Sequence, residues 1–212
     1  MSASRQARRE RLELAELLLA VGPDESTLCE GWTTRDLAAH LVVREGRPDA
    51  APGIALPPFA GWTARVQASV ASRPYPELVR AVRTGPPRLS VFSLPGMDGL
   101  ANLAEYYVHH EDVRRGAPGW EPRDLDPELA DLLWGRLSTM GRLLVRSSPV
   151  GVTLERADGP GGRIVAKGGA GVTLRGTAGE LLLRAYGRHA VQVEVDGPAD
   201  AVAAFESASL GI

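Results

Sequence analysis

The sequence of 212 residues contains a single cysteine and no long apolar run. Cys29 alone cannot form an internal disulfide, and no stretch reaches the ~18 apolar residues that a membrane-spanning helix needs. The N-terminal stretch does not resemble a signal peptide, because Glu13 and Glu16 interrupt its apolar positions. These absences predict a protein of a reducing, cytoplasmic compartment.

An excess of positive charge is also missing, since the formal net charge is −2 at pH 7. Binding to phosphates requires a basic face, so this balance argues against a nucleic-acid or membrane-surface partner. The arginines at positions 5, 8, 9 and 11 have the spacing of a solvated helix face. With 44% hydrophobic residues, the chain can form a sizeable core in one large domain or two small ones.

Apolar residues recur at helical spacing through most of the first 147 residues, and glycines and prolines separate the runs. Thr33 or Thr34 can cap the second helix, and Asp126 followed by Pro127 can begin the last one. The expected helices are 4–21, 34–44, 59–71, 76–83, 102–116 and 127–146. We predict an all-α N-terminal domain over residues 1–147.

The pattern changes after Pro149, where short runs rich in β-branched residues indicate strands. The expected strands are 150–156, 163–167, 171–175 and 190–195, with helices at 177–186 and 198–209. A glycine-rich loop at 158–162 joins the first two strands as a hairpin. We predict a small α+β domain over residues 150–212, and therefore an α+β protein.

The stretch NLAEYYVHHED, from Asn102 to Asp112, concentrates groups that bind metals. Glu105, His109 and Asp112 are spaced by four and three residues, so they share one face of a helix. A carboxylate and an imidazole one turn apart can chelate a divalent ion, and the second acid can complete the site or orient the imidazole. The same pair can also be a solvated contact within the helix.

His40 is the natural third ligand, because leucines flank it on the inward face of the second expected helix. Two helices of one bundle can deliver His40, Glu105 and His109 to one point. A histidine on an apolar helix face can alternatively be a hydrogen-bonded core residue. The adjacent His110 offers a competing imidazole, rotated by ~100° around the helix.

Cys29 precedes the second helix and allows two interpretations. A catalytic thiol requires an electropositive, partly exposed setting, and the neighbouring Glu30 opposes this. A small buried packing residue is the preferred interpretation. Trp32 is likewise expected to be a packing residue, with the lining of a ligand pocket as its alternative.

Three parts of the sequence together resemble the mycothiol-dependent maleylpyruvate isomerase family, which belongs to the DinB-like superfamily of four-helix metalloproteins. These parts are the run CEGWTTRDLAAHL, the Glu-x3-His-x2-Asp pattern and the later GELLLRAYGR. The resemblance implies an N-terminal DinB-like four-helix bundle followed by a small sterol-carrier-like α+β domain. It also implies a divalent metal, usually zinc, held by His40, Glu105 and His109.

The resemblance further implies that the Gly187-Arg188 element supplies a basic residue to the active site. Arg188 would hold a carboxylate through a forked contact, and a surface role at a helix C-terminus is the alternative. The position of Asp112 assigns it to accept the free N–H of His109 and thereby to orient that imidazole, without contacting the metal.

Zinc with three protein ligands keeps an open position, and a thiol bound there is deprotonated. The expected function is activation of a low-molecular-weight thiol, mycothiol in the resembling family, toward an electrophilic small molecule. The protein would be an isomerase or a thiol S-transferase, acting as a monomer or a homodimer. The alternatives are a noncatalytic metal- or ligand-binding protein of the same fold, and a bundle whose polar network holds no metal.

Overall fold

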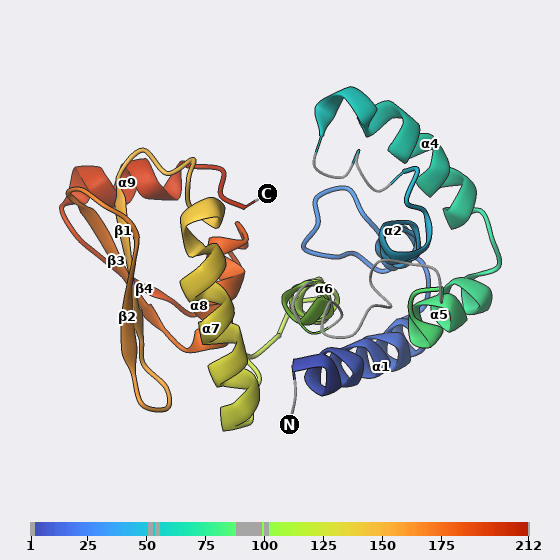
Figure 1. Cartoon of the computed structure of the whole chain (residues 1–212), viewed down its shortest axis with the longest axis horizontal. Helices are drawn as coiled ribbons and strands as arrows, with labels where there is room; N and C mark the ends of the chain where they lie inside the picture. Colours follow the sequence, from blue (N-terminus) through green and yellow to red (C-terminus); the bar gives the residue numbers. More distant parts are fainter. Residues whose placement is uncertain (1–2, 51–52, 54–55, 88–98, 100–101, 212) are drawn as a thin grey trace. The chain divides into compact units, whose positions relative to one another are not determined.

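The computed structural model describes residues 3–50, 53, 56–87, 99 and 102–211 (Figure 1). These residues form two compact units, one ending at Trp120 and the other beginning at Glu121. The first unit is helical, and the second combines helices with a four-stranded sheet. The predicted α+β class is confirmed.

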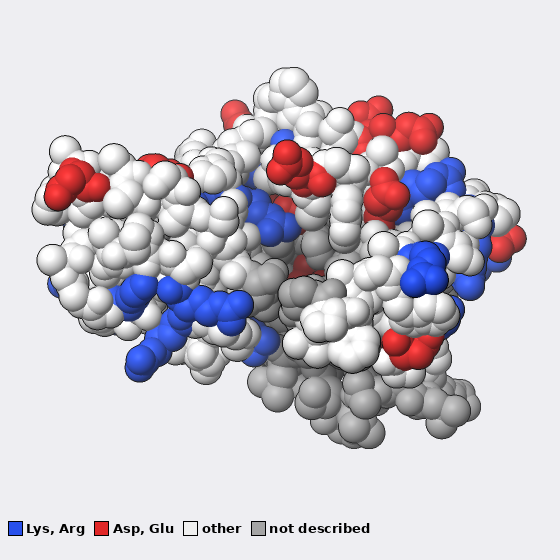
Figure 2. Space-filling model, turned by 90° about the horizontal axis from the view of Figure 1, so that it is seen from above, with Lys and Arg blue, Asp and Glu red and all other residues white. Residues whose placement is uncertain are grey.

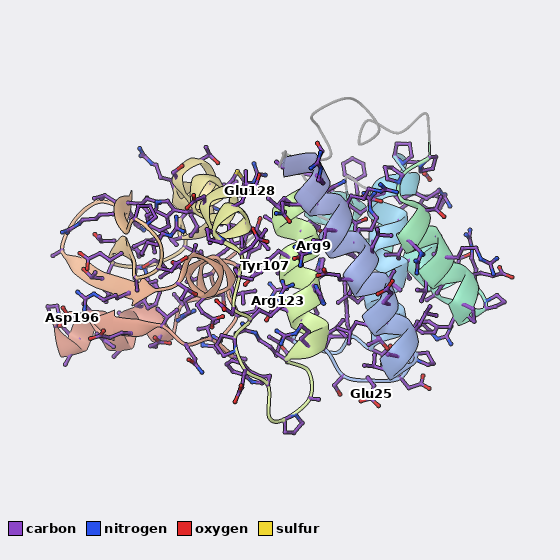
Figure 3. The ribbon with its side chains drawn as sticks, turned by 90° about the horizontal axis from the view of Figure 1, so that it is seen from below. Arg9, Glu25, Tyr107, Arg123, Glu128 and Asp196 are labelled. Carbon is purple, nitrogen blue, oxygen red and sulfur yellow. The ribbon has the colours of Figure 1, made fainter. Side chains whose placement is uncertain are left out.

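The helices of the first unit follow the ranges that the apolar periodicity predicts. They are α1 (Ala3–Val21), α2 (Thr34–Gly46), α4 (Ala60–Ala71), α5 (Tyr75–Thr84) and α6 (Leu103–Arg114), with a short 3-10 helix η1 (Pro57–Phe59) before α4. Helix α1 packs along α6, and α2 packs on α4 and α5. Figure 3 shows α1 beside α6, with Arg9 labelled on the first and Tyr107 on the second.

A capping box begins α2 at Thr33, one of the two threonines that the sequence offers. The Asp36 N–H donates to the Thr33 hydroxyl, and the Thr33 N–H donates to the Asp36 carboxylate. The loop before α2 is tied to the C-terminal part of α6, because the Leu28 N–H donates to the Asp112 carbonyl at 3.0 Å. These bonds fix both the start of α2 and the position of the preceding loop.

The core of the first unit is built from leucines of α1, α2 and α5 together with Tyr106 of α6. The fully buried leucines are Leu14, Leu18, Leu37, Leu41 and Leu78. Burial of each such side chain contributes ~1.5–3 kcal/mol to the hydrophobic driving force. Because Leu37 and Leu41 anchor α2, the intervening His40 is held on the inward side of the helix.

The second unit is a sheet with helices packed on it. Its elements are α7 (Pro127–Leu144), β1 (Gly151–Arg156), β2 (Gly162–Lys167), β3 (Gly171–Gly176), α8 (Ala178–Ala185), β4 (Glu194–Asp196) and α9 (Ala199–Glu206). The strand order is β2-β1-β3-β4, with β1 antiparallel to β2 and parallel to β3, and with β3 antiparallel to β4. Leu154 and Leu174 are buried in the sheet, and Figure 1 shows α7 and α8 on one side of it.

Two features differ from the boundaries that the sequence predicts. The expected division near residues 147–150 lies instead between Trp120 and Glu121, because α7 packs on α8 and β2. Asp126 caps α7 and Pro127 begins it, as predicted. Strand β4 is shorter than the expected 190–195, since the N–H of Gln192 donates to the Glu180 side chain at 2.6 Å and not to a neighbouring strand.

Candidate metal centre

Helices α2 and α6 bring His40, Glu105 and His109 together. The Nε2 atom of His40 lies 3.4 Å from Oε1 of Glu105, and Nε2 of His109 lies 3.3 Å from the same oxygen. The two imidazole rings stand nearly at right angles, with centroids 5.2 Å apart and an interplanar angle of 71°. One potential ligand atom from each residue lies within 4.8 Å of the others.

Asp112 lies on the far side of the His109 ring from Glu105. Its Oδ2 is 2.9 Å from Nδ1 of His109, so a proton on that nitrogen is donated to the carboxylate. This leaves Nε2 of His109 facing Glu105. The arrangement fixes the orientation of the imidazole, which is the usual task of a carboxylate behind a metal-binding histidine.

Cys29 joins the same cluster through Asp112. Its Sγ lies 3.2 Å from Oδ2 of Asp112 and 4.0 Å from Nδ1 of His109, and the side chain is half-buried. The preferred interpretation as a buried packing residue therefore misses a polar contact. No local spacing in the sequence indicates this contact, because it depends on the bond that ties the 22–33 loop to α6.

Arg44 is a second residue that the sequence reasoning missed. Its Nε lies 3.1 Å from Oε1 of Glu105, and its Nη1 donates to the Asn102 side chain at 2.5 Å. Asn102 in turn donates to Glu45, which pairs with Arg11 at 3.1 Å. Arg44 follows His40 by four residues on α2, so the two share one face of the helix. That spacing could have indicated that Arg44 lies beside the candidate centre.

Burial and pairing shift the acid–base properties of the three central groups. Burial alone would raise the pKa of Glu105, but hydrogen bonds from His109 and His40 and the charge of Arg44 hold it well below its usual value. Burial would likewise lower the pKa of His109, yet hydrogen bonds with Asp112, Cys29 and Glu105 carry it well above the ordinary value. Burial lowers the pKa of His40 despite its hydrogen bond with Glu105.

His110 does not compete with His109 for the centre. Its Nδ1 lies 3.0 Å from Oε2 of Glu10 on α1, and both residues are buried. Glu10, Glu13 and His110 form a separate group whose potential ligand atoms also lie within 4.8 Å of one another. The rotation around the helix thus directs the two adjacent imidazoles to different partners.

Arg188 belongs to the second unit, where it follows α8. Its Nη1 donates to the Tyr186 carbonyl at 2.8 Å, a contact at the end of that helix. Gly187 between them has φ of +87°, which a residue with a side chain adopts only with strain. This local contact agrees with the helix-terminus alternative, and the role of Arg188 in carboxylate binding stays a prediction.

The donor set around Glu105 fits a divalent transition metal. Two imidazole nitrogens and one carboxylate suit zinc better than magnesium, which prefers oxygen ligands. The group formed by Cys29, His109 and Asp112 is a second arrangement that could hold an ion. It would use Nδ1 of His109, the nitrogen that already bonds Asp112.

In the view of Figure 2, basic side chains gather over part of the second unit, at the left. On the side of the molecule seen in Figure 2, acidic and basic side chains alternate over the first unit, at the right of the view. Among the helices that the structure describes, none is long and apolar enough to cross a membrane.

Fold and site together define the class: an α+β protein whose helical unit carries a histidine and carboxylate cluster able to hold a metal. No family model and no curated protein matches the sequence. Among solved structures, the chain is similar to the mycothiol-dependent maleylpyruvate isomerase, crystallised as a mutant with one histidine replaced by alanine. The TM-score is 0.58 at 14% identity, over 92% of this chain and 91% of the other. At this identity the likeness establishes a shared fold.

Replacement of His40 by Ala is expected to abolish stoichiometric metal binding, because it removes one of three convergent donors. Wild-type protein should retain about one zinc per chain after chelator washing and reloading, measured by elemental analysis. Cys29→Ala should retain it too, since it leaves His40 and Glu105 intact. His189→Ala is the matched histidine control, with its side chain 65% exposed. Loss of zinc in Cys29→Ala and retention in His40→Ala would assign the metal to the other donor set.

Replacement of Asp112 by Asn should weaken zinc binding by ~10 to 100-fold and still leave a filled site at high zinc. Oδ2 of Asp112 lies 2.9 Å from Nδ1 of His109 and orients the ring. The nitrogen of His109 that faces Glu105 is the other one, Nε2. Titration against a competing chelator measures the affinity. Complete loss of binding, equal to that of His109→Ala, would make Asp112 a direct ligand.

Proposed function

We propose that this protein binds one zinc ion through His40, Glu105 and His109 and activates a low-molecular-weight thiol for reaction with an electrophilic small molecule. Mycothiol is the candidate thiol, because the structurally similar protein is by name a mycothiol-dependent isomerase. The reaction would be an isomerisation or an S-transfer. A reducing, cytoplasmic setting belongs to the proposal, since the thiol must be free.

The observation that carries the proposal is the convergence of three ligand atoms within 4.8 Å, with Asp112 holding His109 by its other nitrogen. Such an arrangement leaves Nε2 of each histidine available on the Glu105 side. A zinc ion bound there would lower the pKa of a thiol that coordinates it. The thiol would then be a thiolate, and so a nucleophile, at neutral pH. The likeness in fold extends over nearly the whole chain, which supports a related chemistry.

The side chains around the site have separate tasks in this proposal. Asp112 accepts the Nδ1 proton of His109 and fixes the ring, and Cys29 contacts the same carboxylate. Arg44 holds the Glu105 carboxylate from the α2 side. Arg188 would bind a carboxylate of the thiol or of the electrophile.

A noncatalytic metal- or ligand-binding protein is the second candidate. A polar network that holds no metal is the third, and one observation favours it. Oε1 of Glu105 already contacts His40, His109 and Arg44, so its charge is compensated before any ion binds. The same contacts would allow a polar network that holds no metal. Metal analysis separates that case from the other two, and a test of turnover separates the enzyme from the binding protein.

Zinc-loaded protein is expected to accelerate conjugation of mycothiol to an electrophile, and His40→Ala should lose this acceleration. The loss should exceed the ~10 to 100-fold that removal of an orienting partner costs, because a metal ligand is removed. Thiol consumption and product formation are followed with zinc-loaded and chelator-treated samples. His189→Ala should match wild type. One bound zinc without acceleration over a broad panel of electrophiles would favour the noncatalytic candidate.

A further inference from the structure

A pocket of about 390 Å³ opens beside His40 in the first unit. Trp32 forms part of its wall, with ring centroids of Trp32 and His40 5.0 Å apart. Small side chains of α4 form another part, and they are Ala60, Ala64 and Ala68. The volume suits a small organic molecule, and the aromatic and alanine walls suit an apolar one.

The charge of this pocket is negative. Asp36 is the only charged side chain among the described residues that line it, and hydrogen bonds from the Thr33 N–H at 3.0 Å and hydroxyl at 2.8 Å hold its carboxylate. The neighbouring Arg35 donates instead to backbone carbonyls at the end of α4, and Arg44 pairs with Glu105. An anionic ligand would therefore meet a fixed carboxylate and no cation among the described lining residues.

Gln67 supplies the pocket with an uncharged polar group. Its side chain lines the cavity and has no hydrogen-bond partner among the residues that the structure describes. The neighbouring Thr63 donates its hydroxyl to the Ala50 carbonyl at 2.5 Å and is already engaged. A primary amide on an apolar wall can donate to a carbonyl oxygen of a ligand.

We propose that this pocket receives the electrophile and selects an uncharged conjugated carbonyl compound. The apolar body of the ligand packs on Trp32 and the alanines, and its carbonyl oxygen accepts from Gln67. This inference rests on the proposed thiol chemistry. The sulfur–carbon bond forms at the β-carbon while the carbon–carbon π bond breaks, and the proton that the thiol lost returns at the α-carbon. The product is a thioether, with no oxidant or reductant required.

Binding of unreactive probes tests the charge selection independently of turnover. Dimethyl succinate and succinate share a carbon skeleton, and the first is neutral whereas the second is a dianion. We expect the zinc-free full-length chain to bind the diester at least about tenfold more tightly in NMR titrations, because Asp36 repels the dianion. Zinc-free protein is used so that succinate cannot coordinate a metal. Equal or tighter binding of succinate would overturn the proposal.

Two substitutions at Ala64 form a matched pair, because each introduces a long polar side chain and only one of the two side chains is charged. Ala64→Arg adds a cation to the pocket and should erase the preference for the diester, whereas Ala64→Gln should preserve it. Gln67→Leu should weaken diester binding by roughly 3 to 10-fold, the effect of one lost hydrogen bond. Zinc content of each variant should match wild type, because none of these residues belongs to the candidate donor set. An unchanged preference in Ala64→Arg would remove α4 from the binding site.

Turnover with zinc-loaded protein then distinguishes a failure of the selection for an uncharged electrophile from a failure of the proposed thiol chemistry. Dimethyl maleate should be conjugated with a larger enhancement over its uncatalysed rate than maleate. Diester binding without any conjugation would contradict the proposed enzyme and leave the selection for an uncharged ligand supported. Conjugation of both compounds with equal enhancement would support the enzyme and overturn the selection for an uncharged electrophile.

Discussion

The structure of the first unit depends on the pairing of polar and charged side chains that α6 carries into the interior. His109, His110, Glu111 and Asp112 are consecutive and buried. A buried charge without a partner costs several kcal/mol, so each must find a counter-group. His109 meets Asp112, His110 meets Glu10, and Glu111 pairs with Arg114 and Arg115. The packing of α1 along α6 therefore pairs buried polar groups as well as apolar ones.

Such burial is poor evidence for a role in stability alone. Well-packed apolar residues in place of a buried ion pair are often neutral or stabilising, whereas removal of one partner is strongly destabilising. Around Glu105 the polar groups are also more numerous than one ion pair requires, since two imidazoles and the Arg44 guanidinium converge on one oxygen. The two imidazoles, and not the guanidinium, are the physical reason to look for a metal there, because imidazole nitrogens and a carboxylate oxygen together form a donor set for a divalent ion.

The sequence predicted most of what depends on local spacing. Apolar periodicity placed the helices of the first unit, and the intervals of four and three residues put Glu105, His109 and Asp112 on one face of α6. The association of α7 with the sheet was not predictable, because its apolar face fits either a bundle or a sheet equally well. Cys29 was missed for a similar reason: its partner Asp112 lies 83 residues away.

All the polar groups of the candidate centre lie in the first unit. His40 and Arg44 come from α2, Glu105 and His109 from α6, and each precedes the division at Trp120. The same holds for the pocket beside His40, whose described lining lies on α2, α4 and the neighbouring loops. The described residues that we propose to hold the metal and to receive the electrophile therefore all belong to the first unit. Arg188 of the second unit stays the proposed group for a carboxylate of the thiol, because a guanidinium binds a carboxylate through a forked contact and the pocket beside His40 offers a carboxylate instead, that of Asp36.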